Sequence, residues 1–401
     1  MHPQPTIRWT FPLFVFASLL AGVCHADDAA APKRGQRLYL DQFRPASELK
    51  APHHVVTRAK FPCVNVHTHP EKLTDAELDE MVAAMDGGNI AVSVSLDGRV
   101  GPRLVEHLQR LNTRYPQRFV VFVRMEYVGD GNPDDPTSWV VQRRHFGSWM
   151  ADRLTESVRQ GACGLKLLKD LGLGIRDGNG KRIPPDDPRF DPVWQRAGEL
   201  GIPVLWHCAD PVAFFRPIDE HNERWEELYR HPEWSFYGQD FPTHQELIDA
   251  RMRVIARHPQ TQFICAHMAD IPEDLSQLGR QLDEHPNMSV EIAARVAELG
   301  RQPYTARKFF LNYADRILFG TDGVPPPTEL DPHWRFLETL DESFPYEDNP
   351  FPPQGFWNIY GLGLPDEVLL KVYHENAARL IPKVRAALDQ FQPPLRSTDK
   401  P

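Results

Sequence analysis

Beyond its first 26 residues, the sequence lacks any apolar stretch long enough to cross a membrane, and it has no excess of basic residues. A transmembrane helix needs about 20 consecutive apolar residues. The formal net charge is -10 at pH 7. This acidic balance argues against nucleic acid or an anionic membrane as the main partner, because phosphate groups attract basic surfaces. We expect a soluble protein whose partner is a small-molecule substrate.

Cysteine is scarce as well, with five residues in a chain of 401. One lies in the N-terminal segment, and the other four sit in or beside apolar runs that are far apart in the sequence. An even number of cysteines in an exported protein permits disulfides. Apolar surroundings favour buried free thiols instead. We predict free thiols at Cys63, Cys163, Cys208 and Cys265.

Residues 1–26 have the pattern of a secretory signal peptide. Arg8 gives a weakly basic start, FPLFVFASLLAGV is an apolar core, and Cys24-His25-Ala26 is a cleavage site of small residues. An uncleaved membrane anchor is the alternative. Because Arg8 is the one charged residue in this segment, cleavage would change the formal charge from -10 to -11. We expect a periplasmic or secreted protein with no membrane span in the mature chain.

Eight short apolar runs alternate with amphipathic segments from residue 62 onward. Segments such as TDAELDEMVAAM and HQELIDARMRVIARHP place apolar residues three or four positions apart, which is typical of helices that pack on one face. Strand-like runs separated by helices favour a (β/α)8 TIM barrel, and a doubly wound open sheet is the alternative. The runs cover residues 63–69, 89–97, 118–125, 162–168, 202–208, 262–268, 287–293 and 316–322.

The same patterns divide the chain into a signal peptide, an extension, a barrel and a flexible tail, at residues 1–26, 27–57, 58–385 and 386–401. Two connections are too long for ordinary loops. Residues 208–240, after the fifth run, are rich in Trp, Tyr and Phe, and residues 323–364, after the eighth, are rich in Pro and aromatic residues. Both follow strands at the end where such barrels carry their sites, so we interpret them as lid loops. Packing of the barrel rim is the alternative.

The first apolar run, CVNVHTH, ends in two histidines. Side chains alternate along a strand, so His67 and His69 share a face and Val64 and Val66 take the other. We therefore expect the valines to pack outward against helices and the histidines to point into the barrel mouth.

Other runs also end in residues that can bind a metal ion. His207 closes IPVLWHC, His267 closes QFICAHM apart from one residue, and Asp322 closes RILFGTD. The carboxyl ends of all barrel strands meet at one face. These three residues are therefore predicted to converge with the histidine pair of the first run.

With these motifs the sequence resembles the amidohydrolase superfamily, specifically the amidohydrolase-related (amidohydrolase 2) branch of hydrolases and non-oxidative decarboxylases. The resemblance runs from about residue 58 to 383 and includes the closing helix VLLKVYHENAARLI. It implies that His67, His69, His207 and Asp322 bind a metal, and that His267 activates or orients a metal-bound water. Asn65 departs from the family, which has an aspartate at this position.

Three histidines and one aspartate suit a single divalent ion, and zinc is the metal that these ligand types favour. A divalent cation lowers the pKa of a bound water toward neutrality. Asp322 can then hold the proton of the attacking water, which makes it a catalytic candidate together with His267. Lys166 is open to two interpretations. It pairs with a carboxylate or contacts substrate, or it is a carbamate that bridges two metals, as in binuclear relatives.

Four residues near strand ends are candidates for substrate binding: Arg99, Lys166, Glu291 and Arg295. Arginine binds carboxylates through two parallel hydrogen bonds. The alternatives are a solvated loop arginine at position 99 and a salt bridge between Glu291 and Arg295.

The leading hypothesis is a metal-dependent hydrolase that acts on a small polar ester, lactone or amide through a metal-bound water. A non-oxidative decarboxylase of a small carboxylic acid, a carbon–carbon lyase, is the second. A non-catalytic binding protein on the same barrel is the third. The oligomeric state stays open, with a homodimer among the alternatives.

Overall fold

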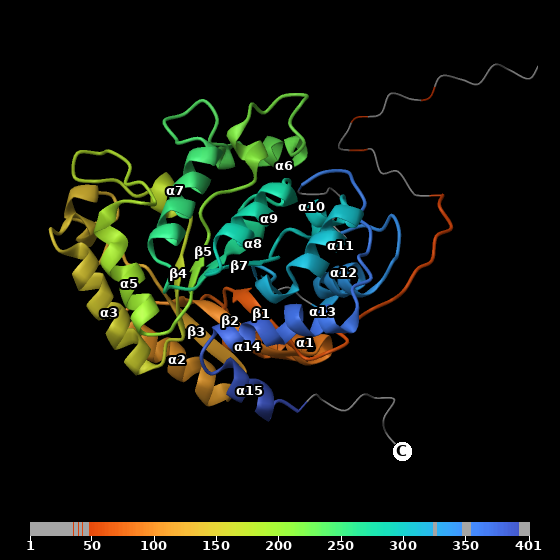
Figure 1. Cartoon of the computed structure of the whole chain (residues 1–401), viewed down its shortest axis with the longest axis horizontal. Helices are drawn as coiled ribbons and strands as arrows, with labels where there is room; N and C mark the ends of the chain where they lie inside the picture. Colours follow the sequence, from red (N-terminus) through yellow and green to blue (C-terminus); the bar gives the residue numbers. More distant parts are fainter. Residues whose placement is uncertain are drawn as a thin grey trace, which may run out of the picture. The chain divides into compact units, whose positions relative to one another are not determined.

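Eight parallel strands form a sheet in which each strand pairs with the next one in the sequence (Figure 1). They are β1 (Cys63–Thr68), β2 (Ile90–Gly98), β3 (Phe119–Arg124), β4 (Gly164–Leu167), β5 (Val204–Trp206), β6 (Phe263–Cys265), β7 (Met288–Glu291) and β8 (Ile317–Leu318). The backbone N–H of Val66 donates to the carbonyl of Phe319 at 3.0 Å, which links β1 to the end of β8. The predicted (β/α)8 barrel is confirmed.

This computed structural model describes residues 48–323, 327–346 and 354–392, as well as Gly35, Tyr39 and Gln42. Of residues 327–331 it describes the backbone alone. The predicted signal peptide, residues 1–26, lies outside the described residues. The fold concerns the unit that begins at Ser47.

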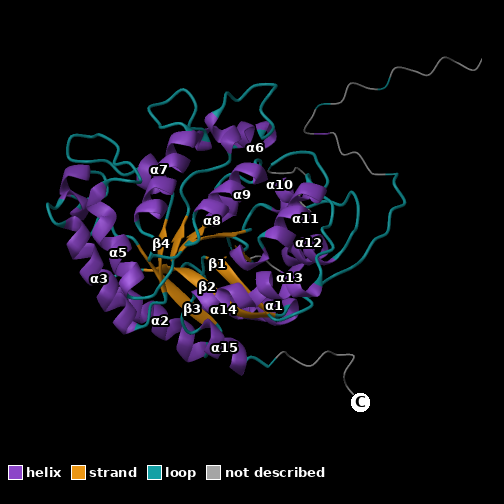
Figure 2. Ribbon diagram, viewed as in Figure 1, coloured by secondary structure: helices purple, strands orange, loops and turns teal. Residues whose placement is uncertain are grey.

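Helices surround the strands (Figure 2). They are α1 (Asp75–Gly88), α2 (Pro102–Arg114), α3 (Phe146–Gln160), α4 (Asp170–Leu173), α5 (Asp191–Glu199), α6 (Trp225–Arg230), α7 (His244–Arg257), α8 (Ala266–Ala269), α9 (Leu275–Glu284), α10 (Val296–Gly300), α11 (Pro303–Asn312), α12 (Pro327–Glu338), α13 (Asp366–Leu370), α14 (Asn376–Leu380) and α15 (Val384–Gln390). Capping boxes begin α1 at Thr74 and α7 at Thr243, where each threonine exchanges hydrogen bonds with a glutamate three residues later.

The buried apolar residues form two layers. The outer layer lies between strands and helices, as where Leu165 and Leu167 pack with helix residues. The inner layer fills the barrel with residues from opposite strands, including Leu205 and Ile264.

Val64 and Val66 belong to this inner layer, so the prediction that they pack outward was wrong. The pairing of β1 with β2 shifts register between Cys63 and Val64 and again between Asn65 and Thr68. Such irregularities break strict alternation of side chains.

The C-terminal helices α14 and α15 cover the inner layer at the amino ends of the strands. Ala377, Leu380, Val384 and Ala387 are buried there together with residues of the barrel interior. Residues 386–390, which we assigned to the flexible tail, are therefore part of a packed helix. The remainder of the tail beyond residue 392 lies outside the described residues.

The long connection after β5 contains α6 and two short 3₁₀ turns. Three of its aromatic side chains, Tyr229, Trp234 and Tyr237, are exposed. The connection after β8 contains α12, but residues 324–326 and 347–353 lie outside the described part. A role of either connection as a lid stays a prediction.

All four cysteines of the barrel are buried and free, which confirms the expected thiols. No helix in the described part of the chain is long and apolar enough to cross a membrane.

Asn376 ties the closing helix to the sheet. Its Nδ2 donates to the carbonyls of Ala314 at 2.7 Å and Ile317 at 2.8 Å. Asn376→Ala leaves two carbonyls without this donor, so the free energy of unfolding should fall by about 2 kcal/mol. Chemical denaturation measures this change. Glu375→Ala, at an exposed neighbouring residue, is the control and should change stability by less than about 0.5 kcal/mol. Equal losses for the two variants would contradict the assigned role.

Candidate metal centre

His67 lies at the end of β1 with 1% of its surface exposed. Its Nδ1 hydrogen-bonds to Oε1 of Glu291 at 3.0 Å. Its Nε2 lies 3.0 Å from Oδ1 of Asp322 and accepts from Nζ of Lys166 at 3.2 Å. A carboxylate behind one ring nitrogen fixes the ring and leaves the other nitrogen for a ligand, as in metal-binding histidines.

His69 is arranged in the same way. Its Nδ1 hydrogen-bonds to Oδ1 of Asp97 at 2.8 Å, and its Nε2 lies 3.5 Å from Oδ1 of Asp322. Arg124, at the end of β3, pairs with the same Asp97 carboxylate. Burial lowers the pKa of His69, but hydrogen bonds to Asp322 and Asp97 raise it more, so that the pKa lies above its usual value.

His267 follows β6 and is buried. Its Nδ1 donates to the carbonyl of Ala293 at 2.9 Å. Its Nε2 is buried without a hydrogen-bond partner and lies 3.8 Å from Oδ2 of Asp322. Burial, strengthened by the nearby charge of His207, holds the pKa of His267 well below its ordinary value. This ring is therefore neutral near pH 7 and can accept a metal or a proton.

His207 follows β5 and packs against His267, with 4.3 Å between ring centroids. It is anchored through the opposite nitrogen: Nε2 donates to the carbonyl of Ala209 at 3.0 Å and lies 3.6 Å from Asp210. Among the described residues, its Nδ1 has no hydrogen-bond partner.

Asp322 follows β8 in a left-handed backbone conformation, with a φ of 63°. Its N–H donates to the carbonyl of His67 at 3.1 Å. Burial raises the pKa of Asp322, but the charge of His67 and hydrogen bonds from His67 and His69 outweigh burial and hold it well below the usual range. The carboxylate is therefore ionised at neutral pH.

Two residues join the segment around Asp322 to the barrel. Asn65 donates to Oγ1 of Thr321 at 2.8 Å, and its Oδ1 accepts from the N–H of His67 and of Thr321, each at 3.2 Å. A Cβ on Gly320 would lie 2.4 Å from Oε2 of Glu291, so this position has room for glycine alone. The amide thus keeps a structural role at the family's usual aspartate position.

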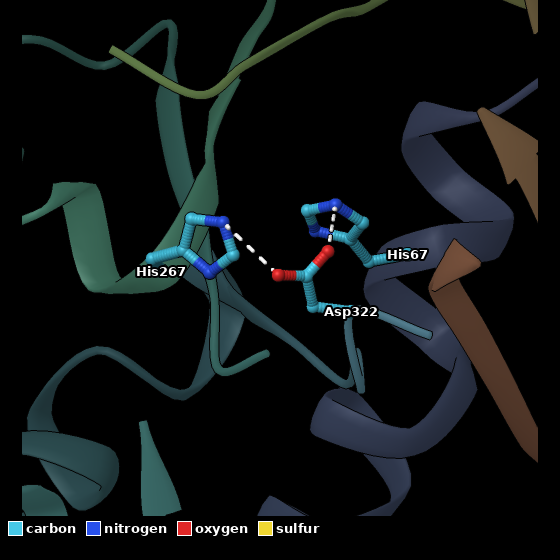
Figure 3. Close-up of side chains that lie close together, drawn as sticks. All are labelled: His67, His267 and Asp322. Carbon is cyan, nitrogen blue, oxygen red and sulfur yellow. Dashed lines mark ion pairs between the residues drawn. The ribbon is translucent and has the colours of Figure 1, made fainter. Parts of the chain in front are cut away.

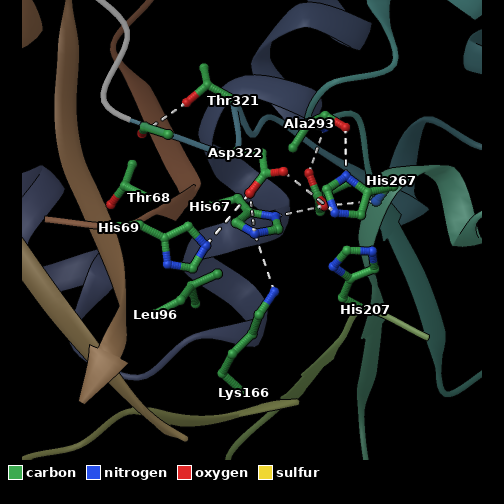
Figure 4. A network of polar contacts seen from close by, with 12 residues as sticks. His67, Thr68, His69, Leu96, Lys166, His207, His267, Ala293, Thr321 and Asp322 are labelled. Atoms are coloured by element: carbon green, nitrogen blue, oxygen red, sulfur yellow. Dashed lines mark hydrogen bonds and ion pairs between the residues drawn. The ribbon is translucent and has the colours of Figure 1, made fainter. Parts of the chain in front are cut away.

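Together these side chains form a compact group at the carboxyl ends of the strands. Ligand atoms of His67, His267 and Asp322 lie within 4.8 Å of one another, with the carboxylate between the two rings (Figure 3). His69 and His207 lie beside this group (Figure 4). Each of the four rings has one anchored nitrogen and one nitrogen free of backbone and orienting groups. A set of imidazoles around an ionised carboxylate fits a divalent cation.

The residues predicted to bind substrate have different surroundings. Arg99 pairs with Glu71, with 3.1 Å between Nη2 and Oε2. Lys166 is fully buried against His67, and burial lowers its pKa to about 8. Glu291 pairs with His67 rather than with Arg295, so the alternative of a salt bridge between them is not borne out.

Arg295 is buried without a carboxylate partner among the described residues. It is 5% exposed. Its Nη1 donates to the carbonyl of Ala294 at 2.6 Å, and its Nε has no partner. Burial, together with the neighbouring charge of Arg224, lowers the pKa of Arg295.

Sequence reasoning missed Asp97 and Arg124, which orient His69. Asp97 closes the predicted strand of residues 89–97, so the position at a strand end was a usable signal. Nothing local distinguishes Arg124, because its role depends on the pairing of β3 with β2.

Comparison with known proteins places the chain in a family. A family model described as Amidohydrolase matches residues 124–383, which is more than half of the chain. No curated protein sequence matches significantly.

Solved structures resemble the chain at low identity. An uncharacterized TIM-barrel protein from Bordetella bronchiseptica is 14% identical over 82% of this chain and 99% of its own, with a TM-score of 0.47. A 2,6-dihydroxybenzoate decarboxylase from Rhizobium is 17% identical over 80% and 98%, with a TM-score of 0.46. The 4-oxalomesaconate hydratase of Rhodopseudomonas palustris is 13% identical over 82% and 98%, with a TM-score of 0.45.

These likenesses are too distant to carry any argument about the reaction. The family match and the eight-stranded barrel agree with each other. The chain belongs to the amidohydrolase family of TIM-barrel enzymes.

Proposed function

We propose that the protein is a metal-dependent hydrolase of a small polar ester, lactone or amide. The observation that carries the proposal is the set of four anchored imidazoles around the ionised Asp322 at the carboxyl ends of the strands. TIM-barrel enzymes place their active sites at this face. The family match supports an enzyme but leaves the reaction open.

One divalent cation, preferentially zinc, would be held by His67, His69, His207 and Asp322. Such an ion supplies Lewis acidity and lowers the pKa of a bound water. We assign Lys166 to the support of His67 rather than to a carbamate between two metals, because its Nζ lies 3.2 Å from Nε2 of that ring.

The chain's own groups would handle the proton and the substrate. Asp322 is ionised and would accept the proton of the attacking water, then return it to the leaving group. His267, with its buried and unpartnered Nε2, would orient that water or a substrate oxygen. Glu291 would act behind His67 and not on the substrate.

Arg295 favours a substrate that carries an anionic group. A buried guanidinium without a counter-ion is costly, and a substrate carboxylate would supply that counter-ion through paired hydrogen bonds. Arg99 is already paired with Glu71, which makes it the weaker candidate. The same feature is what favours the second candidate function, a non-oxidative decarboxylase of a small carboxylic acid.

Metal binding tests the ligand assignment. We expect purified protein to contain one divalent ion per chain in elemental analysis. His207→Asn should lose the metal, because it removes a direct ligand, whereas His267→Asn should keep it and lose turnover. His231→Asn, at a half-exposed histidine, is the control and should change neither. An empty site in His267→Asn with metal retained in His207→Asn would reverse the two roles. Two ions per chain would contradict the single-metal proposal.

Asp322→Asn tests the reaction itself. Wild-type protein is assayed on lactones, esters, amides and hydroxybenzoates, with release of acid and of carbon dioxide measured in parallel. Loss of the proton acceptor should lower turnover about a hundredfold to ten-thousandfold, while metal content falls only in part. Asp315→Asn, at an exposed carboxylate, should keep full activity. Carbon dioxide release without acid release would replace the hydrolase by the decarboxylase.

Arg295→Met tests the anionic handle. The variant should raise KM at least about tenfold for carboxylate-bearing substrates, since each charge-assisted hydrogen bond contributes about 1.5–3 kcal/mol, and should leave neutral esters nearly unchanged. Arg118→Met removes a guanidinium that is paired with Asp86 at the amino end of β3 and serves as control. An equal rise in KM for neutral and anionic substrates would contradict this assignment.

A further inference from the structure

The segment after β6 has an unusual backbone. Four consecutive residues, none of them glycine, have left-handed φ values: His267 at 56°, Met268 at 54°, Ala269 at 57° and Asp270 at 57°. In this conformation the Cβ of an L-residue crowds the following carbonyl oxygen, and runs of such residues are rare. The turn is closed by hydrogen bonds from the N–H of Asp270 to the carbonyl of His267 at 3.1 Å and from Ile271 to Met268 at 3.3 Å.

A buried ion pair holds the end of this turn. Arg251, on α7, is fully buried. Its Nη1 donates to Oδ2 of Asp270 at 2.8 Å, and its Nη2 donates to the carbonyl of Ala269 at 2.7 Å. One guanidinium thus binds both a side chain and a backbone oxygen of the left-handed turn.

Two further contacts secure the same residue. The Nε2 of His244, also on α7, donates to the carbonyl of Asp270 at 2.9 Å. The N–H of Cys208, just after β5, donates to Oδ2 of Asp270 at 3.3 Å. Because His244 and Arg251 come from one helix, α7 fixes the turn from outside the barrel.

The other end of the turn carries His267. The N–H of His267 donates to Oε1 of Glu291 at 2.8 Å, the oxygen that also binds Nδ1 of His67. A change of backbone handedness here would break this bond and redirect the imidazole away from Asp322. The direction of the ring therefore depends on the left-handed turn.

We propose that Arg251 is a positioning residue: its contacts with Ala269 and Asp270 stabilise the left-handed turn and so keep His267 directed toward Asp322. The catalytic consequence rests on the proposed function, whereas the conformational part does not. Arg251 acts through the turn and touches no reacting group.

The test is a double-mutant cycle between the ion pair and the backbone. Arg251→Met/Asp270→Asn removes the pair without leaving a lone buried charge. Ala269→Gly removes the crowded Cβ, and glycine adopts positive φ without steric cost. If Arg251 holds a strained turn, loss of the pair should lower Tm at most half as much in the Ala269→Gly background as in the wild-type background. Additive changes in Tm would overturn the proposal.

Gln117→Gly supplies the matched control. Gln117 is an exposed residue that also has a left-handed φ, 65°, but it lies between α2 and β3. Loss of the ion pair should lower Tm by the same amount with or without Gln117→Gly. A rescue by Gln117→Gly as large as that by Ala269→Gly would show a general effect on stability and would overturn the positioning role.

Amide exchange measured by mass spectrometry reads the turn without substrate or metal. Peptides spanning residues 266–271 should exchange at least about tenfold faster when the pair is lost, and Ala269→Gly should slow that exchange again. Unchanged exchange in this segment would overturn the proposal. If the double variant does not fold, Arg251→Lys goes through the same cycle, because it keeps the charge but loses the two-point contact.

Turnover separates this proposal from the proposed function. On any substrate that the wild type hydrolyses, loss of the pair should lower kcat about tenfold or more with a smaller change in KM, and Ala269→Gly should restore most of it. Wild-type kcat in a variant with fast exchange would overturn the link to His267. If the wild type hydrolyses nothing, the proposed function fails, while Tm and exchange still decide whether Arg251 holds the turn.

Discussion

The buried carboxylate of Glu291 is the contact on which the rest of the candidate site depends. Its Oε1 binds Nδ1 of His67 at 3.0 Å and the N–H of His267 at 2.8 Å, and its Oε2 binds the N–H of Ala293 at 2.6 Å. Burial raises the pKa of Glu291, but the charge and hydrogen bond of His67 outweigh it and lower the pKa. One ionised side chain on β7 thereby orients a ring from β1, the turn after β6 and, through its Oε2, the glycine at position 320.

The groups around the site divide into those with complete hydrogen bonding and those without. Asp97, Glu291 and the Arg251–Asp270 pair are buried with charged or hydrogen-bonded partners. By contrast, Nε2 of His267 and Nε of Arg295 are buried without partners. Buried polar groups are nearly always paired, because desolvation without a hydrogen bond is costly. The unpaired atoms gather where a metal and a substrate would bind, and this distribution underlies the proposed function.

Parts of the site could be predicted from local pattern alone. His67, His207, His267 and Asp322 each follow an apolar run, and a closed barrel brings the ends of such runs together. The orienting groups could not be predicted in this way. Glu291 lies 224 residues from the ring that it holds, and we assigned it to substrate. Export also stays a prediction, because residues 1–26 lie outside the described part of the chain.

Periodicity in the sequence determined the eight strands, their order and the face that carries the site, because apolar alternation and helical spacing are local properties. Tertiary structure alone decided which nitrogen of each histidine is anchored, since Asp97, Glu291 and Ala293 reach the rings from other strands. It also decided that Val64 and Val66 face the barrel interior, because the register shifts in β1 arise from pairing with β2. The left-handed turn at His267 likewise needs Arg251 from a separate helix, as no local preference of these four residues favours positive φ throughout.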